Sequence, residues 1–186
     1  MNKVAVVTGS PKHVASVCRA FVANGTEALS LADLSPGTGP IDCYVQLGVT
    51  VPARGETVVR RAHAFLNDGL LERFRAAERL MPLLADDATV LLVAGNLPAE
   101  VADPDDRKAR LALLRVLAHA MRADLAPSQV RVRVVTGERS DEEIVAYALS
   151  GAKDPLADLA AEHGAVIGKT YEDWRIAVMG LVHVQT

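Results

Sequence analysis

Short apolar runs alternate with longer amphipathic segments along the chain. The apolar runs are rich in Val and Leu, which predicts strands buried on both faces of a parallel sheet. These predicted strands are Lys3–Val7, Glu27–Leu31, Ile41–Leu47, Ala88–Ala94, Gln129–Val135 and Arg175–Val184. Elsewhere apolar residues recur every three to four positions, which predicts helices with one buried face. We expect a helix between Ser10 and Gly25, and helices over Thr57–Ala85, Asp105–Leu125, Ser140–Leu149 and Asp154–His163.

Local signals support several of these helices. Ser10 is a favourable N-cap, and Pro11 after it suits the first helical position. The segment Asp-Pro-Asp-Asp at 103–106 combines a cap, a proline and two acids at the positive end of a helix. Asn-Asp-Gly at 67–69 lies inside the long segment and can divide it into two helices.

The alternation of strands and helices predicts the fold class. Strands that alternate with helices form a parallel sheet covered on both faces. We therefore expect an α/β protein with one Rossmann-like, three-layer αβα domain over residues 1–186. Its sheet is expected to be six-stranded and mostly parallel, with right-handed crossovers.

Charge and composition narrow the partners. The net charge of −3 is unlike the basic excess of a duplex DNA binder, so we expect no nucleic-acid partner. No apolar run approaches the ~20 residues that span a bilayer, so we expect no membrane segment. Cys18 and Cys43 lie in apolar runs and give no metal-ligand set. They suit a reducing compartment, and we expect a cytoplasmic protein.

The order of these segments resembles the short-chain dehydrogenase/reductase family over residues 3–149. Lys-Val-Ala-Val-Val-Thr-Gly at 3–9 is typical of the family's first strand. Asp33 follows the second strand, where a family acid contacts the cofactor's adenosine ribose. Gln46 and Gly48 lie in a segment similar to the family's Asn-Asn-Ala-Gly strand. Residues 76–93 are similar to the helix and strand that precede the catalytic serine, and residues 130–137 to the sixth strand.

The departures from the family pattern are as informative. Two glycine positions of the phosphate-binding turn are His13 and Ala15, and we expect the His13 side chain to project into the phosphate space. Ala94 and Gly95 stand where the catalytic serine is expected. Pro104 stands at the tyrosine position, four residues before Lys108. The family's α-β-α unit after the second strand, which forms part of the adenine pocket, is missing. Without its strand, the resemblance implies a six-stranded sheet with the strand order 2-1-3-4-5-6.

Because of these departures, the sequence offers few candidates for cofactor binding or catalysis. The candidates for cofactor binding are Gly9, Lys12, His13, Asp33, Gln46 and Gly48. Lys12, His13 and Asp33 are more often explained as solvated polar groups at a loop or strand end than as ligand-binding residues. If the chain is an enzyme, Lys108 and Asn96 are the nearest polar candidates for proton transfer. We expect no metal, since a helix cap explains Asp103, Asp105 and Asp106.

These observations favour a non-catalytic homologue of the family, acting as a structural or regulatory subunit with no expected cofactor. A divergent NAD(P)-dependent oxidoreductase is the alternative, and a small-ligand sensor is a further one. We expect a homo- or hetero-oligomer formed through the helices Thr57–Ala85 and Asp105–Leu125. The second helix has two apolar stripes, of which the sheet can cover one, and these helices form the dimer interface in the family.

Overall fold

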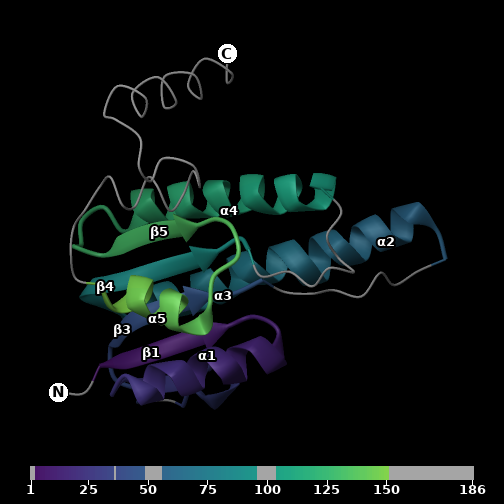
Figure 1. Ribbon diagram of the computed structural model, residues 1–186. Coiled ribbons are helices and arrows are strands. Elements are labelled where there is room, and N and C mark those ends of the chain that lie inside the picture. The colour runs from purple at the N-terminus through teal and green to yellow at the C-terminus, as the bar shows by residue number, and fades with distance from the viewer. Residues whose placement is uncertain (1–2, 36, 49–55, 96–103, 151–186) are drawn as a thin grey trace, which may run out of the picture.

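A computed structural model describes residues 3–35, 37–48, 56–95 and 104–150 (Figure 1). Its centre is a parallel sheet with the strand order β2-β1-β3-β4-β5. The strands are β1 (Val4–Thr8), β2 (Glu27–Ser30), β3 (Ile41–Gln46), β4 (Leu84–Val93) and β5 (Arg131–Val135). Buried Val and Leu side chains of the strands lie on both faces of the sheet, as the apolar runs predict. The predicted Rossmann-like fold class is confirmed, whereas the sixth strand, Arg175–Val184, lies outside the described residues.

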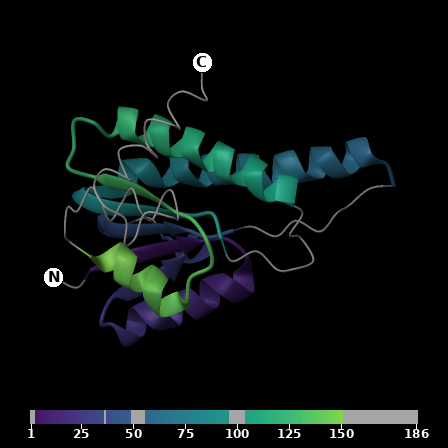
Figure 2. The same ribbon diagram turned by 45° about the horizontal axis from the view of Figure 1, so that its top comes forward.

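Helices cover both faces of the sheet and give three layers (Figure 2). They are α1 (Pro11–Ala23), α2 (Val58–Ala64), α3 (Glu72–Leu80), α4 (Pro104–Asp124) and α5 (Asp141–Leu149). On one face, α1 and α5 pack on the sheet through side chains such as Phe21 and Ile144. On the other, Leu80 of α3 and Met121 of α4 pack against Tyr44 and Leu92. The predicted helix Asp154–His163 lies outside the described residues.

The prediction of a long helix over Thr57–Ala85 is wrong at its carboxyl end. The α-helix stops at Leu80, a 3₁₀ turn spans Met81–Leu83, and β4 already begins at Leu84. Pro82 lies in that turn and has no N–H to continue the helical hydrogen bonds. At Asn67-Asp68-Gly69 the helix does not break but widens into a π-helical segment, Phe65–Leu71, between α2 and α3.

The caps of α1 and α5 differ. Ser140 and Glu143 form a reciprocal capping box at α5, with Glu143 N donating to Ser140 Oγ at 3.2 Å. Ser10 occupies the N-cap position of α1, but its side chain makes no cap hydrogen bond. Its hydroxyl donates instead to the Gly48 carbonyl at 3.3 Å. The start of α1 is therefore attached to the end of β3.

The two apolar stripes of α4 have different surroundings. Leu114, Ala118 and Met121 of one stripe are buried against the sheet. Val116 of the other stripe is 57% exposed, and its neighbours Ala112 and Ala120 are exposed as well. The sheet thus covers one stripe and leaves most of the other on the surface. In the part of the chain that the structure describes, no helix is long and apolar enough to cross a membrane.

Candidate functional site

The carboxyl edge of the sheet brings most of the candidate residues together. In open parallel sheets, ligands bind at this edge, close to the point where the chain reverses its direction of strand addition. Here that point lies between β1 and β3, with β2 added on the far side of β1. The turn after β1, the end of β3 and the end of β2 therefore lie where a sheet of this topology binds its ligand.

The turn after β1 is in direct contact with the end of β3. Gly9 has φ +141°, and a Cβ atom there would lie 2.7 Å from the Leu47 Cβ atom. Leu47 N donates to Thr8 O at 2.8 Å, and Ser10 N to Gly48 O at 3.4 Å. Gly9 and Gly48 thus allow a close approach of two backbones, which is an architectural role.

The N–H groups of the same turn are largely used within the protein. Ser10 N donates to Gly48 O, and Pro11 has no N–H. His13 N donates to Ser10 O at 3.0 Å. A phosphate site at a helix start depends on N–H groups that point at the anion. The turn is therefore poorly equipped to hold the pyrophosphate of a dinucleotide.

The His13 side chain is held by α5. Its Nε2 atom lies 3.2 Å from Asp141 Oδ1, and the Ser16 hydroxyl donates to Asp141 Oδ2. Asp141 is the first residue of α5, where the positive end of the helix favours a carboxylate. The ring is thus engaged with α5, where we expected it to project into the phosphate space. Lys12 beside it is exposed.

A groove of about 500 Å³ lies beside this turn, between the ends of β1 and β2 and the first turns of α1. Its lining is mostly apolar, with Val7, Val14 and Leu31 among the contributors. The polar lining comes from Thr8, Gly9, Ser30 and Asp33. An apolar cleft with a few placed polar groups is the usual form of a small-ligand site. A hollow thus remains next to Asp33 even though the α-β-α unit after β2 is missing.

Asp33 lies at this groove and is exposed. Its Oδ2 atom accepts hydrogen bonds from the Ser30 hydroxyl at 2.6 Å and from Ser30 N at 3.2 Å. These two bonds lower the pKa of the Asp33 carboxyl. The nearby thiol of Cys18 also lines the groove, and burial, followed by the Asp33 charge, raises its pKa. Asp33 is therefore an anion whose Oδ2 already caps a turn.

Gln46 points into a buried network on the α3 side of the sheet. Its Nε2 atom donates to Tyr44 Oη at 2.7 Å and to Arg73 O at 2.9 Å. Tyr44 Oη lies 3.4 Å from Thr8 Oγ1, so the network spans β1, β3 and α3. Burial is the main cause that raises the pKa of Tyr44. Gln46 therefore has structural partners and does not line the groove.

Arg73 is a central residue of the edge that sequence reasoning missed. It is 3% exposed, and its Nη2 atom donates to Leu47 O at 2.7 Å and to Val93 O at 3.4 Å. Burial, and after it the charge of Arg110, lower its pKa to about 10. The available signal was its spacing, because Arg73 shares the helical stripe of Ala77 and Leu80. It connects the carboxyl ends of β3 and β4.

The ends of β4 and β5 are packed against each other without intervening space. A Cβ atom at Gly95 would lie 1.7 Å from Gly137 O and 2.5 Å from Gly137 C. Ala94 N donates to Val135 O at 2.9 Å, so the contact continues the ladder beyond the strands. Since the clash is with backbone, no rotation of a side chain relieves it. Of the two positions where a catalytic serine is expected, Ala94 and Gly95, the second therefore has no room for a serine side chain.

The remaining catalytic candidates are described only in part. Pro104 is the first residue of α4, and Lys108 lies in the first turns of that helix. The Lys108 side chain and all of Asn96 lie outside what the structure describes. Among the described residues, no cluster of three or more His, Cys, Asp or Glu side chains is arranged to hold a metal ion.

No family model and no curated protein matches the sequence. Among solved structures, the chain is similar to a small-chain dehydrogenase, at 17% identity and a TM-score of 0.58, over 90% of this chain and 100% of the other. A short-chain dehydrogenase/reductase mutant from Serratia marcescens matches at 17% identity and a TM-score of 0.60, over 86% and 93% of the two chains. BdcA from E. coli matches at 14% identity and a TM-score of 0.51, over 86% and 94%. These similarities show that the chain has the fold of the short-chain dehydrogenase/reductases.

Proposed function

We propose that this chain is a non-catalytic homologue of the short-chain dehydrogenases that acts as a structural or regulatory subunit. The observation that carries the proposal is the contact of Gly95 with the Gly137 carbonyl, 1.7 Å from where a Cβ atom would be. In the family, the serine expected here holds the substrate carbonyl while a tyrosine hydroxyl transfers the proton. Here neither expected position is a serine: Ala94 has no hydroxyl, and the space beside Gly95 is filled by the Gly137 backbone.

The described tyrosines do not supply the missing hydroxyl. Tyr44 is buried in the core, with its hydroxyl bonded to Gln46, and burial raises its pKa. A tyrosine that acts as acid and base needs a pKa lowered toward neutrality and contact with the substrate. Tyr147 lies on α5, with the Arg133 guanidinium 5.3 Å from the centre of its ring. Both side chains serve packing.

The surface of α4 supports a role as a subunit. Val116, with Ala112 and Ala120 beside it, forms an exposed apolar stripe. Val59 and Leu66, in the segment that leads to α3, are exposed as well. Figure 2 shows α2, α3 and α4 side by side on one face of the sheet. An apolar surface of this kind is more stable when a second subunit covers it. Our proposal covers both a homodimer and a pair with a catalytic relative.

Two measurements test the proposal. The purified chain, incubated with NADH or NADPH and a panel of ketones and aldehydes, should show no turnover, and turnover at rates ordinary for dehydrogenases refutes it. Light scattering after size exclusion tests the homodimer, which Val116→Asp should dissociate; a monomer would leave only the pair with a catalytic relative. Val22→Asp is the matched control, because Val22 is also exposed, at 61%, but lies on α1 on the opposite face of the sheet.

The groove beside Asp33 favours a second candidate, a protein that binds a small ligand without turning it over. The groove has room for an adenosine-sized group, but the turn next to it lacks the free N–H groups that a pyrophosphate requires. Calorimetry with AMP and NADH tests this candidate, together with alkylation of Cys18, which lines the groove. Protection of Cys18 by AMP supports the ligand-binding candidate. NADH turnover, in contrast, identifies a divergent NAD(P)-dependent oxidoreductase.

A further inference from the structure

The sheet has an open edge at β2. In the described part of the chain, β2 pairs with β1 on one side and with no strand on the other. An edge strand offers unpaired backbone N–H and C=O groups to a further strand, and proteins often protect such edges with lysine, proline or a bulge. The β2 segment, Glu-Ala-Leu-Ser at 27–30, contains neither lysine nor proline, and its pairing with β1 is regular. The strand itself therefore lacks these protective features.

The hydrogen bonds of β2 identify the backbone groups that face its open side. Glu27 N donates to Lys3 O at 3.0 Å, toward β1. In a parallel pair, the N–H and C=O of one residue point to the same side, and the side alternates along the strand. Leu29 therefore also faces β1, whereas the backbone groups of Ala28 and Ser30 face the open side.

Ala28 is the position at which this edge is free. Ser30 N donates outward to Asp33 Oδ2 at 3.2 Å, so the turn after β2 covers that position. No residue that the structure describes forms a hydrogen bond with the N–H or the C=O of Ala28. These two groups can thus form two hydrogen bonds with a strand added beside β2.

The apolar groove of about 500 Å³ lies next to this free position. Ala28 lines it together with Ala15 and Cys18 of α1, and Ala28 packs on the α1 face of the sheet. Alternate side chains of a strand beside β2 therefore point toward the groove. Val22 of α1 is 61% exposed and follows Cys18 by four positions, so it extends this apolar side of the helix. Strand addition uses this combination: backbone hydrogen bonds give affinity, and pockets for alternate side chains give specificity.

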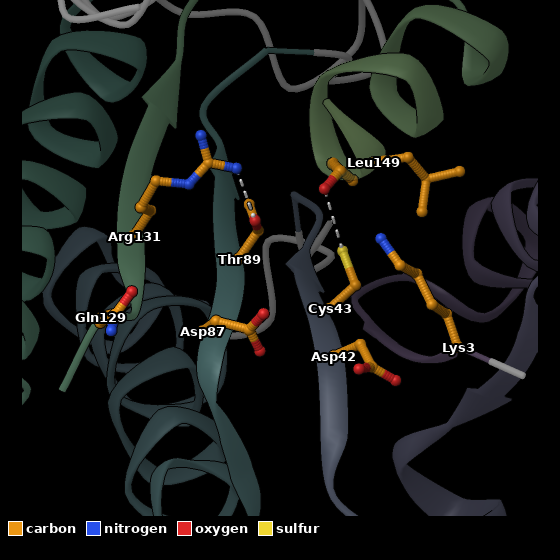
Figure 3. A pocket seen from close by; sticks show the side chains of 9 residues that line it. Lys3, Asp42, Cys43, Asp87, Thr89, Gln129, Arg131 and Leu149 are labelled. Atoms are coloured by element: carbon orange, nitrogen blue, oxygen red, sulfur yellow. Dashed lines mark hydrogen bonds between the residues drawn. The ribbon is translucent and has the colours of Figure 1, made fainter. Parts of the chain in front are cut away.

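We propose that the open edge of β2 binds an extended segment of a partner protein, apolar in its centre and basic at its ends. The strand and the groove contribute two acids, Glu27 and Asp33, and no base. Lys3, the neighbour of Glu27 in the sheet, instead points into a cavity of about 260 Å³ at the amino edge, which no residue of β2 lines (Figure 3). Because both acids are exposed, their charge acts mainly on the rate of association and on the choice of partner.

A second copy of this chain fits the edge less well. If two copies paired antiparallel through Ala28, Ser30 of one copy would lie opposite Thr26 of the other. Thr26 N already donates to Phe21 O at 3.1 Å, and the pairing would bring two acids from each copy to one short edge. The edge is also distinct from the apolar stripe of α4, so this proposal does not depend on the oligomer proposed above.

The test measures the binding of labelled synthetic peptides to the purified full chain by fluorescence anisotropy. The probe alternates Val and Thr and carries a Lys at each end. We expect saturable binding that weakens at least about tenfold when the central residue is Pro, since Pro removes a backbone donor. Replacing both Lys by Glu should weaken binding as well. No binding of the probe, or equal binding of the Pro peptide, would overturn strand addition, and equal binding of the Glu peptide would overturn the assigned charge.

Three variants locate the site on the protein. Ala28→Pro removes an N–H that faces the open side, a change that edge strands tolerate, and urea unfolding checks that the variant folds. It should weaken binding of the probe at least about tenfold, whereas Ala28→Ser, which keeps the N–H, should not. Val116→Asp on α4 should leave the affinity unchanged. Equal affinity of all three variants would refute the site, and an oligomer that Ala28→Pro dissociates would assign the edge to a second copy instead.

Discussion

The two halves of the carboxyl edge differ in the space that they leave for a ligand. At the β1–β2 half, a groove of about 500 Å³ remains beside Asp33. At the β4–β5 half, the backbones of Gly95 and Gly137 are in contact and leave no space. In the family that the chain resembles, one half binds the adenosine end of the cofactor and the other carries the reaction. The comparison teaches that one end of a shared edge can stay open while the other is closed by backbone contact.

A glycine underlies the close packing in each half. Gly9 brings the turn after β1 against Leu47, but the groove opens on the other side of that turn, toward β2. Gly95 brings the end of β4 against the end of β5, where no other side chain could stand. In both halves a glycine without a Cβ atom allows two backbones to come close. Beside Gly9 a groove remains open, whereas beside Gly95 no space remains.

The largest effect is expected from restoring a serine in the closed half. Gly95→Ser places a Cβ atom against the Gly137 backbone and should lower the free energy of unfolding by at least about 2 kcal/mol. Gly39→Ala is the control, because nothing lies within 4 Å of a Cβ atom there, and it should change stability by less than about 0.5 kcal/mol. Urea unfolding measures both. A Gly95→Ser protein as stable as the control would show that this half is open.

An intermediate effect is expected at the contact between α1 and α5, which connects the two halves. Asp141→Ala removes the partner of His13 and Ser16 and should destabilise the protein by about 1 to 2 kcal/mol. Glu142→Ala is the matched control, because Glu142 is also an acid in the first turn of α5 but is exposed. Urea unfolding of the two variants compares them directly. Equal losses would mean that only the interaction with the helix end matters.

The smallest effect is expected on the pKa of the Asp33 carboxyl, which lies beside the groove. Ser30→Ala removes the stronger of the two hydrogen bonds that lower the pKa of Asp33, so that pKa should rise toward its ordinary value. A lowered pKa stabilises the folded state above the ordinary value, and the contribution is lost as the pH falls through the lowered one. The variant should therefore lose less stability on acidification. Carboxyl NMR titration measures the pKa, and Ser35→Ala, whose hydroxyl contacts Thr38, is the control.

The sequence predicts the five described strands and their helices because their signals are local. An apolar run or a helical stripe is visible in a short window, and the strand order follows from the resemblance. The carboxyl end of the helix before β4 was predicted too late in the chain. A 3₁₀ turn that contains Pro82 follows the α-helix, and β4 begins directly after it, at Leu84. Prediction worked where the determinant lay within a few residues.

The candidate site was harder to predict because its determinants lie far apart in the chain. The Gly95–Gly137 contact joins segments 42 positions apart, and the His13–Asp141 contact spans 128. The sequence showed that a serine was missing at Gly95, but not that its space was filled. Arg73 was missed because a charged residue on an apolar stripe is read as exposed, whereas two strand-end carbonyls accept its hydrogen bonds.

Arg73 also has a consequence for how the chain folds. The segment from β3 to β4 spans positions 47–83, as many as the segment 94–130 from β4 to β5, and Arg73 lies within it. Its side chain reaches Leu47, 26 positions earlier, and Val93, 20 positions later. Each contact closes a loop shorter than the connection between the two strands, and the entropy lost on closing a loop grows with its length. We therefore expect Arg73, by joining the ends of β3 and β4 through two shorter loops, to favour their pairing during folding.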